Sequence, residues 1–267
     1  MKFDGKVVLI TDAANPCGKA IAERFAREGA KLALNFPKGG QDAAFDLKEH
    51  LVAEADPANK QAVDALVESV AARFGKIDIL IHSNNEIRRL SFEDCTDEQF
   101  IEDFGVNAKS AFLFTQAVGL KMQAAKSDAS RILYISSIHD EKPTGAAFMY
   151  GISKGAVQML AREAAIDLGV YGVRVNVISC GPVDGAADMF ESDLSKQYEN
   201  LTDRIPLRKV GGVEDFAALA MFLCGDEAKF ISGEDIRVDG GFLLNYHTRM
   251  TYEEFDKMAA DRAEANR

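Results

Sequence analysis

The sequence predicts one α/β domain, a doubly wound parallel sheet with helices on both faces. Short apolar, β-branched runs alternate with segments of helical spacing along the chain, which is the pattern of parallel strands joined by right-handed helical crossovers. A length of 267 residues is enough for one large core. Polar residues follow several of the strand-like runs, and ligands bind at the carboxyl ends of the strands in such sheets.

The first half of the chain predicts four strands and two helices. Residues 6–11 (KVVLIT) form a short apolar run typical of a strand buried on both faces. A helix is expected over residues 17–28, where Ile21 and Phe25 lie four apart and Gly29 follows the end. The other elements expected here are strands at 31–35, 50–55 and 77–81 and a helix at 58–74.

The second half continues the alternation. We expect one long helix over residues 97–125, a strand at 131–136 (RILYIS) and a helix at 148–168. A strand at 173–179, a helix at 213–224 and a short strand at 234–238 complete the domain. The strand ends should bring four separate segments to one crevice, at Thr11, Ile81, Ser137 and Ser179.

Composition excludes several classes of function. The net charge of -11 argues against a nucleic-acid partner, because phosphate binding relies on clustered Lys and Arg. The four cysteines form no close pair in the sequence, so we expect neither a metal site nor a disulfide framework, and a reducing cytoplasm fits. The charged N-terminus lacks the apolar core of a signal peptide, and no apolar run is long enough for a membrane span.

Tyr150 and Lys154 are the strongest indication of chemistry. They lie four apart on an expected helix and therefore share a face. A free tyrosine has a pKa of about 10, and a nearby ammonium favours the phenolate, so Lys154 should lower the pKa of Tyr150. Such a tyrosine can exchange a proton with a substrate hydroxyl or carbonyl. Ser137, at the preceding strand end, can hydrogen-bond the same oxygen.

These residues and their order resemble the short-chain dehydrogenase/reductase family, over roughly residues 4 to 244. The segment YGISK, ending at Lys154, is similar to the family's Tyr-x-x-Ser-Lys, and Ser137 lies thirteen residues before Tyr150, the usual offset. Asn107 matches the asparagine of the family's catalytic tetrad. Further matches in chain order are KVVLIT, Ala55-Asp56, DILI, RVNVISCGP and VDGG.

The resemblance implies a Rossmann-type fold, a domain covering residues 1–244, and roles for particular residues. Tyr150 is the expected acid/base, Ser137 orients the reacting oxygen, Lys154 tunes Tyr150 and contacts the nicotinamide ribose, and Asn107 holds a water in the proton path. The positions expected to bind the dinucleotide are Thr11, Asn15, Gly18, Lys38, Asp56, Ser83, Tyr150, Lys154 and Val183. The remaining residues, 245–267, form an extension beyond the usual end, which we expect to be helical.

The expected cofactor loop departs from the family's Thr-Gly-x-x-x-Gly-x-Gly. Asp12 and Pro16 replace the first two glycines, and Gly18 remains. Asp12 brings negative charge towards the pyrophosphate, and Pro16 has no N–H to offer, although Asn15 and Pro16 still suit a helix start. In the segment HSNN, Asn85 stands where the family has glycine, and His82 is most simply a buried, satisfied histidine.

Cofactor choice depends on the end of the second strand. Phe36 stands where NAD-dependent relatives place a carboxylate, and Lys38 can pair with a 2′-phosphate. This favours NADP, with NAD as the alternative.

We therefore expect an NAD(P)-dependent oxidoreductase that interconverts a small-molecule ketone and a secondary alcohol. The alternative is a protein of the same fold with weakened or lost dinucleotide binding, acting as a binding or scaffold protein or as a non-redox enzyme. By resemblance we also expect a homodimer or homotetramer paired through the two long helices.

Overall fold

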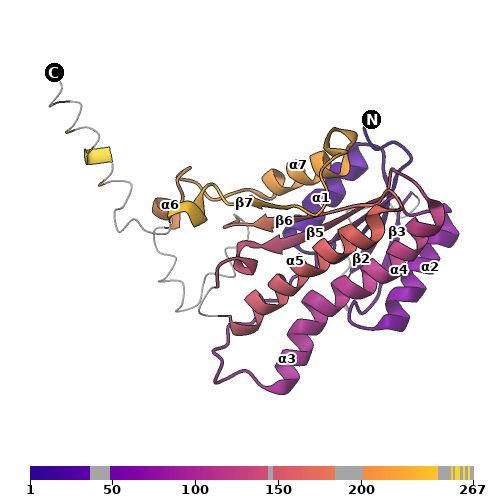
Figure 1. Cartoon of the computed structure of the whole chain (residues 1–267), viewed down its shortest axis with the longest axis horizontal. Helices are drawn as coiled ribbons and strands as arrows, with labels where there is room; N and C mark the ends of the chain where they lie inside the picture. The colour runs from indigo at the N-terminus through magenta and orange to yellow at the C-terminus, as the bar shows by residue number, and fades with distance from the viewer. Residues whose placement is uncertain are drawn as a thin grey trace.

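The computed structural model describes residues 1–36, 49–143, 147–183 and 201–245, with residues 254, 256–258, 261 and 264. Within them, parallel strands form one sheet in the order β3-β2-β1-β4-β5-β6-β7 (Figure 1). The order reverses between β1 and β4, which places the ligand crevice at the carboxyl ends of these strands. The predicted doubly wound parallel sheet is confirmed. The strands are β1 (Val7–Ile10), β2 (Lys31–Phe36), β3 (Leu51–Glu54), β4 (Ile79–His82), β5 (Arg131–Ser137), β6 (Arg174–Cys180) and β7 (Asp235–Val238).

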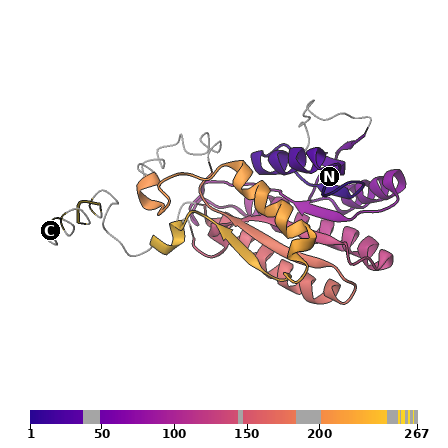
Figure 2. The same ribbon diagram turned by 90° about the horizontal axis from the view of Figure 1, so that it is seen from above.

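Helices cover both faces of the sheet (Figures 1 and 2). The alternation of β1 shows the division: Val8 and Ile10 pack in the core under α1 and α7, and Val7 and Leu9 pack in the core under α2, α4 and α5. The α-helices are α1 (Pro16–Arg27), α2 (Lys60–Phe74), α3 (Asp97–Phe104), α4 (Ser110–Ala125), α5 (Phe148–Gly169), α6 (Leu201–Arg204) and α7 (Val213–Cys224). Short 3-10 turns lie at η2 (Ile138–Asp140), η5 (Asp226–Ala228) and η6 (Phe242–Asn245).

The prediction of a single long helix over residues 97–125 is wrong in one respect. A π-helical turn, η1 (Gly105–Lys109), separates α3 from α4. Asn107 lies in that turn with its side chain fully buried and hydrogen-bonded outside its own helix. Wide turns of this kind are frequent at functional sites, and here the turn carries a residue of the expected tetrad.

Some predicted features lie wholly or partly outside the described residues. Lys38 lies outside them. Of the extension over 245–267, positions 254, 256–258, 261 and 264 are helical, and Asp256 pairs with Arg208. No helix of the described residues is long and apolar enough to cross a membrane.

The RVN segment, matched above to a family motif, closes the far end of the sheet. Arg174, 7% exposed, donates to the carbonyls of Ile231 (3.1 Å), Leu223 (2.7 Å) and Gly225 (3.1 Å). Asn176 donates to the same Ile231 oxygen at 2.9 Å. The segment therefore ties β6 to the end of α7 and has a structural role away from the crevice.

Replacing Arg174 with methionine should lower the free energy of unfolding by roughly 1.5–3 kcal/mol, because buried carbonyls lose a charged donor. Urea denaturation of the purified chain measures this loss. Arg162→Met, on the exposed face of α5, is the matched control and should change stability little. Equal stability of the two variants would contradict the structural role of Arg174.

Candidate active site

The end of β5 and the first turns of α5 bring three of the expected catalytic residues together. Ser137 is the last residue of β5, and Tyr150 and Lys154 lie one turn apart on α5. All three are buried, with exposed fractions of 7%, 6% and 1%. The ammonium Nζ of Lys154 lies 5.5 Å from the centre of the Tyr150 ring, and the Ser137 hydroxyl accepts from the His139 N–H at 3.3 Å.

Consecutive residues after β4 are held by the expected tetrad. Lys154 Nζ donates to the Asn84 carbonyl at 3.0 Å, and Tyr150 donates its hydroxyl to Oδ1 of Asn85 at 2.8 Å. Asn107 accepts from the Glu86 N–H and donates to the Glu86 carbonyl, both at 2.8 Å. Residues 84–86 are thus fixed against α5 and the π-helical turn.

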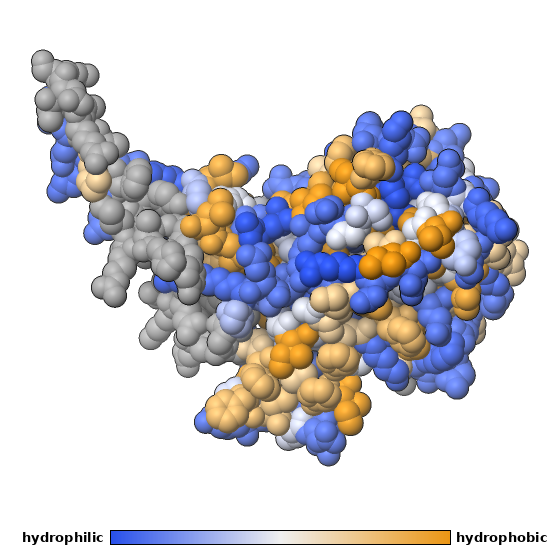
Figure 3. Space-filling view, in the orientation of Figure 1, coloured by the Kyte–Doolittle hydropathy of each residue, from blue (hydrophilic) through white to orange (hydrophobic). Residues whose placement is uncertain are grey.

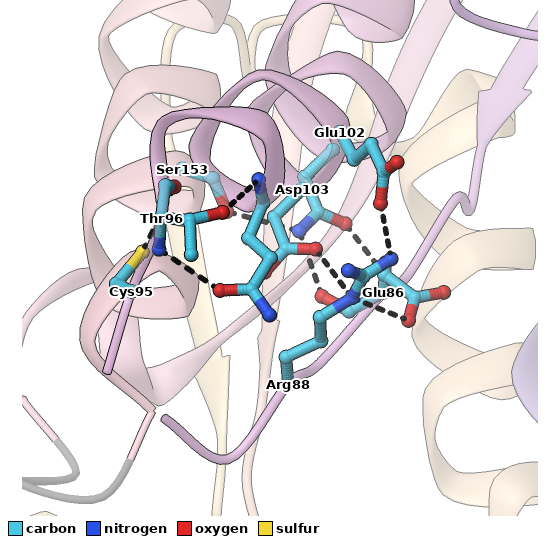
Figure 4. Close-up of polar contacts among 9 residues, drawn as sticks. Glu86, Arg88, Cys95, Thr96, Glu102, Asp103 and Ser153 are labelled. Carbon is cyan, nitrogen blue, oxygen red and sulfur yellow. Dashed lines mark hydrogen bonds and ion pairs between the residues drawn. The ribbon is translucent and has the colours of Figure 1, made fainter. Parts of the chain in front are cut away.

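Further polar contacts anchor this segment from the other side (Figure 4). Asn107 also donates to Oγ of Ser153 at 3.0 Å, so both of its amide hydrogens are used. Arg88 pairs with Asp103 (Nε to Oδ1, 3.0 Å) and with Glu102 (Nη2 to Oε2, 2.8 Å) on α3 (Figure 4). Residues 84–88, which follow β4, are therefore held by polar contacts to α3, α5 and the π-helical turn.

The charges at the site differ from the sequence expectation. Burial raises the pKa of Tyr150 above its usual value, and the Ser137 hydroxyl only partly opposes this. The expected lowering of the pKa of Tyr150 by Lys154 is therefore wrong for this structure, because burial outweighs it. Burial also lowers the pKa of Lys154 to about 8, against the opposing effect of nearby acidic groups. At neutral pH Tyr150 is a neutral phenol beside a charged lysine, which suits a general acid.

Asp140 is a site residue that the sequence analysis missed. Its Oδ2 accepts from Ser136 at 3.0 Å and from Ser179 at 2.7 Å, and burial raises its pKa to about 6. Ser179 also lies 2.6 Å from Oδ1 of Asp235. One hydroxyl has one proton, so Ser179 can donate to only one of these two carboxyl groups at a time. The serines at the ends of β5 and β6 were the available sequence signal.

Asn85 was considered in the sequence only as a tolerant replacement for a backbone glycine. Its backbone angle is not in the left-handed region, which among the described non-glycine residues only Asp12, Lys126 and Arg208 adopt. What matters is its side chain, which holds the Tyr150 hydroxyl. A glycine could not make this contact, so an amide in that position was the signal.

The expected phosphate loop is a compact cluster at the ends of β1 and β4. Asn15 caps α1 by accepting from the Gly18 N–H at 2.8 Å, and it donates to the carbonyl of Ser83 at 2.6 Å. Thr11 Oγ1 accepts from the Ser83 N–H at 3.0 Å. A Cβ on Gly18 would lie 2.6 Å from the carbonyl oxygen of Asp12 and 2.7 Å from Ser83 Oγ. Gly18 is retained because no side chain fits there.

Asp12 stands where the family has a glycine. The change affects the backbone conformation of the loop and also the charge that would face a ligand. Its φ is 46°, an angle at which glycine costs least. Burial raises the pKa of Asp12, and hydrogen bonds from Asn15 and Asn85 oppose this. Pro16 begins the helix without an N–H, and the Gly18 N–H is taken by Asn15. The loop therefore has fewer donors for an anion than the family pattern.

The remaining expected cofactor positions and two histidines lie in different surroundings. Asp56 is exposed at the end of β3 and accepts from the Ala58 N–H at 2.9 Å, and Val183 forms a bridge with Gly211 after β6. His82 is buried, lies 2.9 Å from Ser110 Oγ and has its pKa lowered to about 3 by burial. It is neutral and structural. His139 packs edge-on to the Tyr150 ring, with the ring centres 6.1 Å apart.

The arrangement fits a dinucleotide and offers no metal centre within the described part of the chain. Both polar atoms of the Asn84 side chain are buried without a hydrogen-bond partner, between Lys154 and the loop at the switch point. Unpaired buried amides are costly, and a polar ligand at the crevice would satisfy this one.

Comparison with known proteins agrees with this geometry. The profile of the family described as enoyl-(acyl carrier protein) reductase matches residues 13–243. L-rhamnose 1-dehydrogenase (NAD(P)(+)) of Azotobacter vinelandii is 29% identical, over 90% of this chain and 97% of that protein. Glucose 1-dehydrogenase of Gluconobacter oxydans is 30% identical, over 91% and 94%.

A solved structure supports the same relationship. A short-chain dehydrogenase from Burkholderia cenocepacia in complex with NADP superposes with a TM-score of 0.81 and 27% identity, over 91% of this chain and all of that one. Fold, order of motifs and coverage all agree. The chain therefore belongs to the short-chain dehydrogenase/reductase family, whose members act on CH–OH groups with NAD(P).

Proposed function

We propose that this protein interconverts a ketone and a secondary alcohol with Tyr150 as acid/base, using NADP, with NAD as the alternative. The observation that carries the proposal is the buried, protonated Tyr150 phenol, which follows the Ser137 strand end and lies next to the Lys154 ammonium. Named relatives oxidise rhamnose or glucose at carbon 1, and one relative binds NADP. These names favour a small polyhydroxylated or carbonyl substrate.

The side chains divide the work as follows. The substrate oxygen takes the place of Asn85 Oδ1 as acceptor of the Tyr150 hydroxyl, and Ser137 donates a second hydrogen bond. The Tyr150 proton moves to the substrate oxygen as the carbonyl group becomes an alcohol. The charge of Lys154 stabilises the phenolate that remains. The bound dinucleotide supplies or accepts the hydride. His139 lines the side of the pocket next to the Tyr150 ring.

The same crevice would hold the cofactor. Lys154 and the Asn84 amide would hold the nicotinamide end, and the turn made by Thr11, Asn15, Gly18 and Ser83 would hold the pyrophosphate. Asp56 would contact the adenine and Val183 the nicotinamide. We assign the 2′-phosphate to Lys38, which follows β2.

The alternative remains a protein with weakened dinucleotide binding that acts as a scaffold or non-redox enzyme. The carboxyl group of Asp12 and the missing donor at Pro16 favour it. The burial of the tetrad favours the enzyme, because a binding protein gains nothing from enclosing a lysine and a tyrosine at such a desolvation cost. Cytoplasmic location stays a prediction.

Tyr150→Phe keeps the ring and removes the proton that is transferred. Turnover should fall by at least ~100-fold, the usual contribution of a general acid. The measurement is NADPH oxidation with small ketones or NADP⁺ reduction with sugars, using a substrate found by screening. Tyr171→Phe, a partly buried tyrosine at the end of α5, is the control and should retain activity. Near-parental turnover of Tyr150→Phe would exclude the assignment.

The altered loop should weaken cofactor binding without abolishing it. A charge-assisted hydrogen bond contributes roughly 1.5–3 kcal/mol, so restoring glycine at Asp12 and Pro16 should tighten NADPH binding by about one to two orders of magnitude. Calorimetric dissociation constants of the parent and the double variant test this. If the parent binds tightly and the glycines weaken it, the loop holds its ligand differently. If neither binds a dinucleotide, the scaffold alternative takes first place.

We also propose a homodimer or homotetramer that pairs through α4 and α5. Small side chains on α5 would allow close contact between subunits, but Ala161 and Ala164 pack in the chain's own core. The solvent-facing side of α4 and α5 carries exposed apolar side chains. Apolar surface is visible in the lower part of Figure 3. These residues are Phe112, Leu120, Phe148, Ile152, Met159, Ile166 and Val170.

Light scattering at micromolar concentration should give a dimer or tetramer mass. Ile166→Glu, at a position 71% exposed on this face, should shift the protein towards monomer by placing charge in an apolar contact. Phe230→Glu, a fully exposed aromatic elsewhere, should leave the mass unchanged. A monomeric parent would overturn the proposed assembly.

A further inference from the structure

A chain of polar side chains joins the end of β5 to β6, β7 and α5. Oδ2 of Asp140 lies 3.0 Å from Oγ of Ser136 and 2.7 Å from Oγ of Ser179. The same Ser179 oxygen lies 2.6 Å from Oδ1 of Asp235, and Gln158 donates to the other oxygen of Asp235. The proposed reaction uses none of these residues.

The hydroxyl groups supply too few protons for two ionised carboxyl groups. Ser136 supplies the proton of its own contact, but Ser179 has a single proton for two contacts of hydrogen-bond length. With both carboxyl groups ionised, one of these contacts would set two oxygen lone pairs against each other. A proton on either carboxyl group removes the conflict, because Asp140 then donates to Ser179 while Ser179 donates to Asp235, or the reverse.

The second oxygen of Asp140 indicates the same state. Its Oδ1 is buried and has no hydrogen-bond partner among the described residues. A buried carboxylate oxygen without a donor is costly, and the carbonyl oxygen of a protonated carboxyl group carries less charge. Burial raises the pKa of Asp140 to about 6, and the charge of Asp235 acts in the same direction against the two serine hydrogen bonds.

We propose that Asp140 is a positioning residue for the reaction: it shares one proton with Asp235 through Ser179, and this proton holds the η2 turn and the Ser137 hydroxyl in place. The positioning role rests on the proposed function. The shared proton is measurable without catalysis.

The place of Asp140 in the chain explains its effect on the site. Ser136 directly precedes Ser137, so its bond to Asp140 closes the η2 turn. Within this turn the His139 N–H donates to Oγ of Ser137 at 3.3 Å. Burial is the main cause of the raised pKa of Tyr150, and the charge of Asp140 adds to it. An ionised Asp140 would therefore loosen the turn and hold the Tyr150 proton more tightly.

The other charged groups near the pair have partners of their own. Nη1 of Arg237 pairs with Oε2 of Glu141 at 2.7 Å, and Nζ of Lys154 donates to the Asn84 carbonyl at 3.0 Å. Burial lowers the pKa of Lys154 to about 8, which separates its titration from that of Asp140. The titratable and charged groups around Asp140 are His139 and Glu141 on its own turn, Tyr150 and Lys154 on α5, Cys180 on β6, and Asp235, Arg237 and Asp239 on or next to β7.

Urea denaturation of the full chain between about pH 4 and pH 8 tests the shared proton. Asp140→Asn keeps the shape, and its amide can donate to both serine oxygens without titrating. Folded Asp140 holds its proton up to a higher pH than the unfolded chain does. The free energy of unfolding of the parent should therefore fall, relative to that of Asp140→Asn, as the pH rises to about 6, and then stay level.

Two further variants sharpen this measurement. In Asp235→Asn the new amide can donate to Ser179, which frees the Ser179 proton for Asp140. The pH-dependent fall should then move to lower pH, because Asp140 no longer needs a proton of its own. Asp128→Asn, at an exposed position, is the control and should keep the parental pH dependence.

The pH dependence of kcat/KM for ketone reduction with NADPH tests the positioning role. In the parent, kcat/KM should fall as the pH rises through about 6, and in Asp140→Asn this fall should be absent while activity is retained. Asp140→Ala, which cannot hold the turn, should lower kcat/KM by about 10- to 100-fold at every pH. Its calorimetric dissociation constant for NADPH should be unchanged.

The two measurements have separate outcomes. A stability difference between the parent and Asp140→Asn that does not vary with pH would overturn the shared proton, as would a parental pH dependence in Asp235→Asn. Equal kcat/KM profiles of the parent and Asp140→Asn would overturn the positioning role. If the parent turns over no ketone or sugar, the proposed function fails and the positioning role with it, whereas the unfolding data still decide the shared proton. If Asp140→Asn does not fold, Asp235→Asn decides both questions.

Discussion

The site depends on the hydrogen bonds by which α5 and the π-helical turn hold residues 84–86 in place. Lys154 holds the carbonyl of Asn84 and Tyr150 holds the side chain of Asn85, while Asn107 bonds both backbone groups of Glu86. Each contact satisfies a buried donor that would otherwise be costly. The same contacts fix the orientation of the groups that would meet a substrate. Structural and chemical roles are therefore combined in the same side chains.

Burial sets the protonation states of this centre. It keeps the proton on Tyr150, brings the pKa of Lys154 to about 8 and raises that of Asp140 to about 6. In a low-dielectric crevice the charged form of each group is penalised unless a partner compensates. The lysine retains its charge at neutral pH beside a carbonyl oxygen and nearby carboxyl groups, and the tyrosine stays neutral. This division prepares proton donation to a carbonyl oxygen.

Local sequence signals were sufficient where one element carries the whole pattern. Tyr150 and Lys154 share a helix face by spacing alone, and Asn15 with Pro16 specifies the start of α1. Helical spacing did not predict the interruption of the helix at Asn107, although the resemblance to the family implies a kink at this position. Its cause is a set of hydrogen bonds to Glu86 and Ser153, residues far away in the sequence. The contacts of Asn85 and Asp140 were not predictable for the same reason, because their partners lie on other elements.

The sequence by itself determined the doubly wound sheet, the strand ends that face the crevice and the family motifs, since alternating apolar runs and helical spacing are local properties of the chain. Only the tertiary structure decided the raised pKa of Tyr150 and the inward packing of Ala161 and Ala164. These depend on burial and on distances between separate elements. Such quantities exist only once the strands are ordered in the sheet and the helices are packed on it.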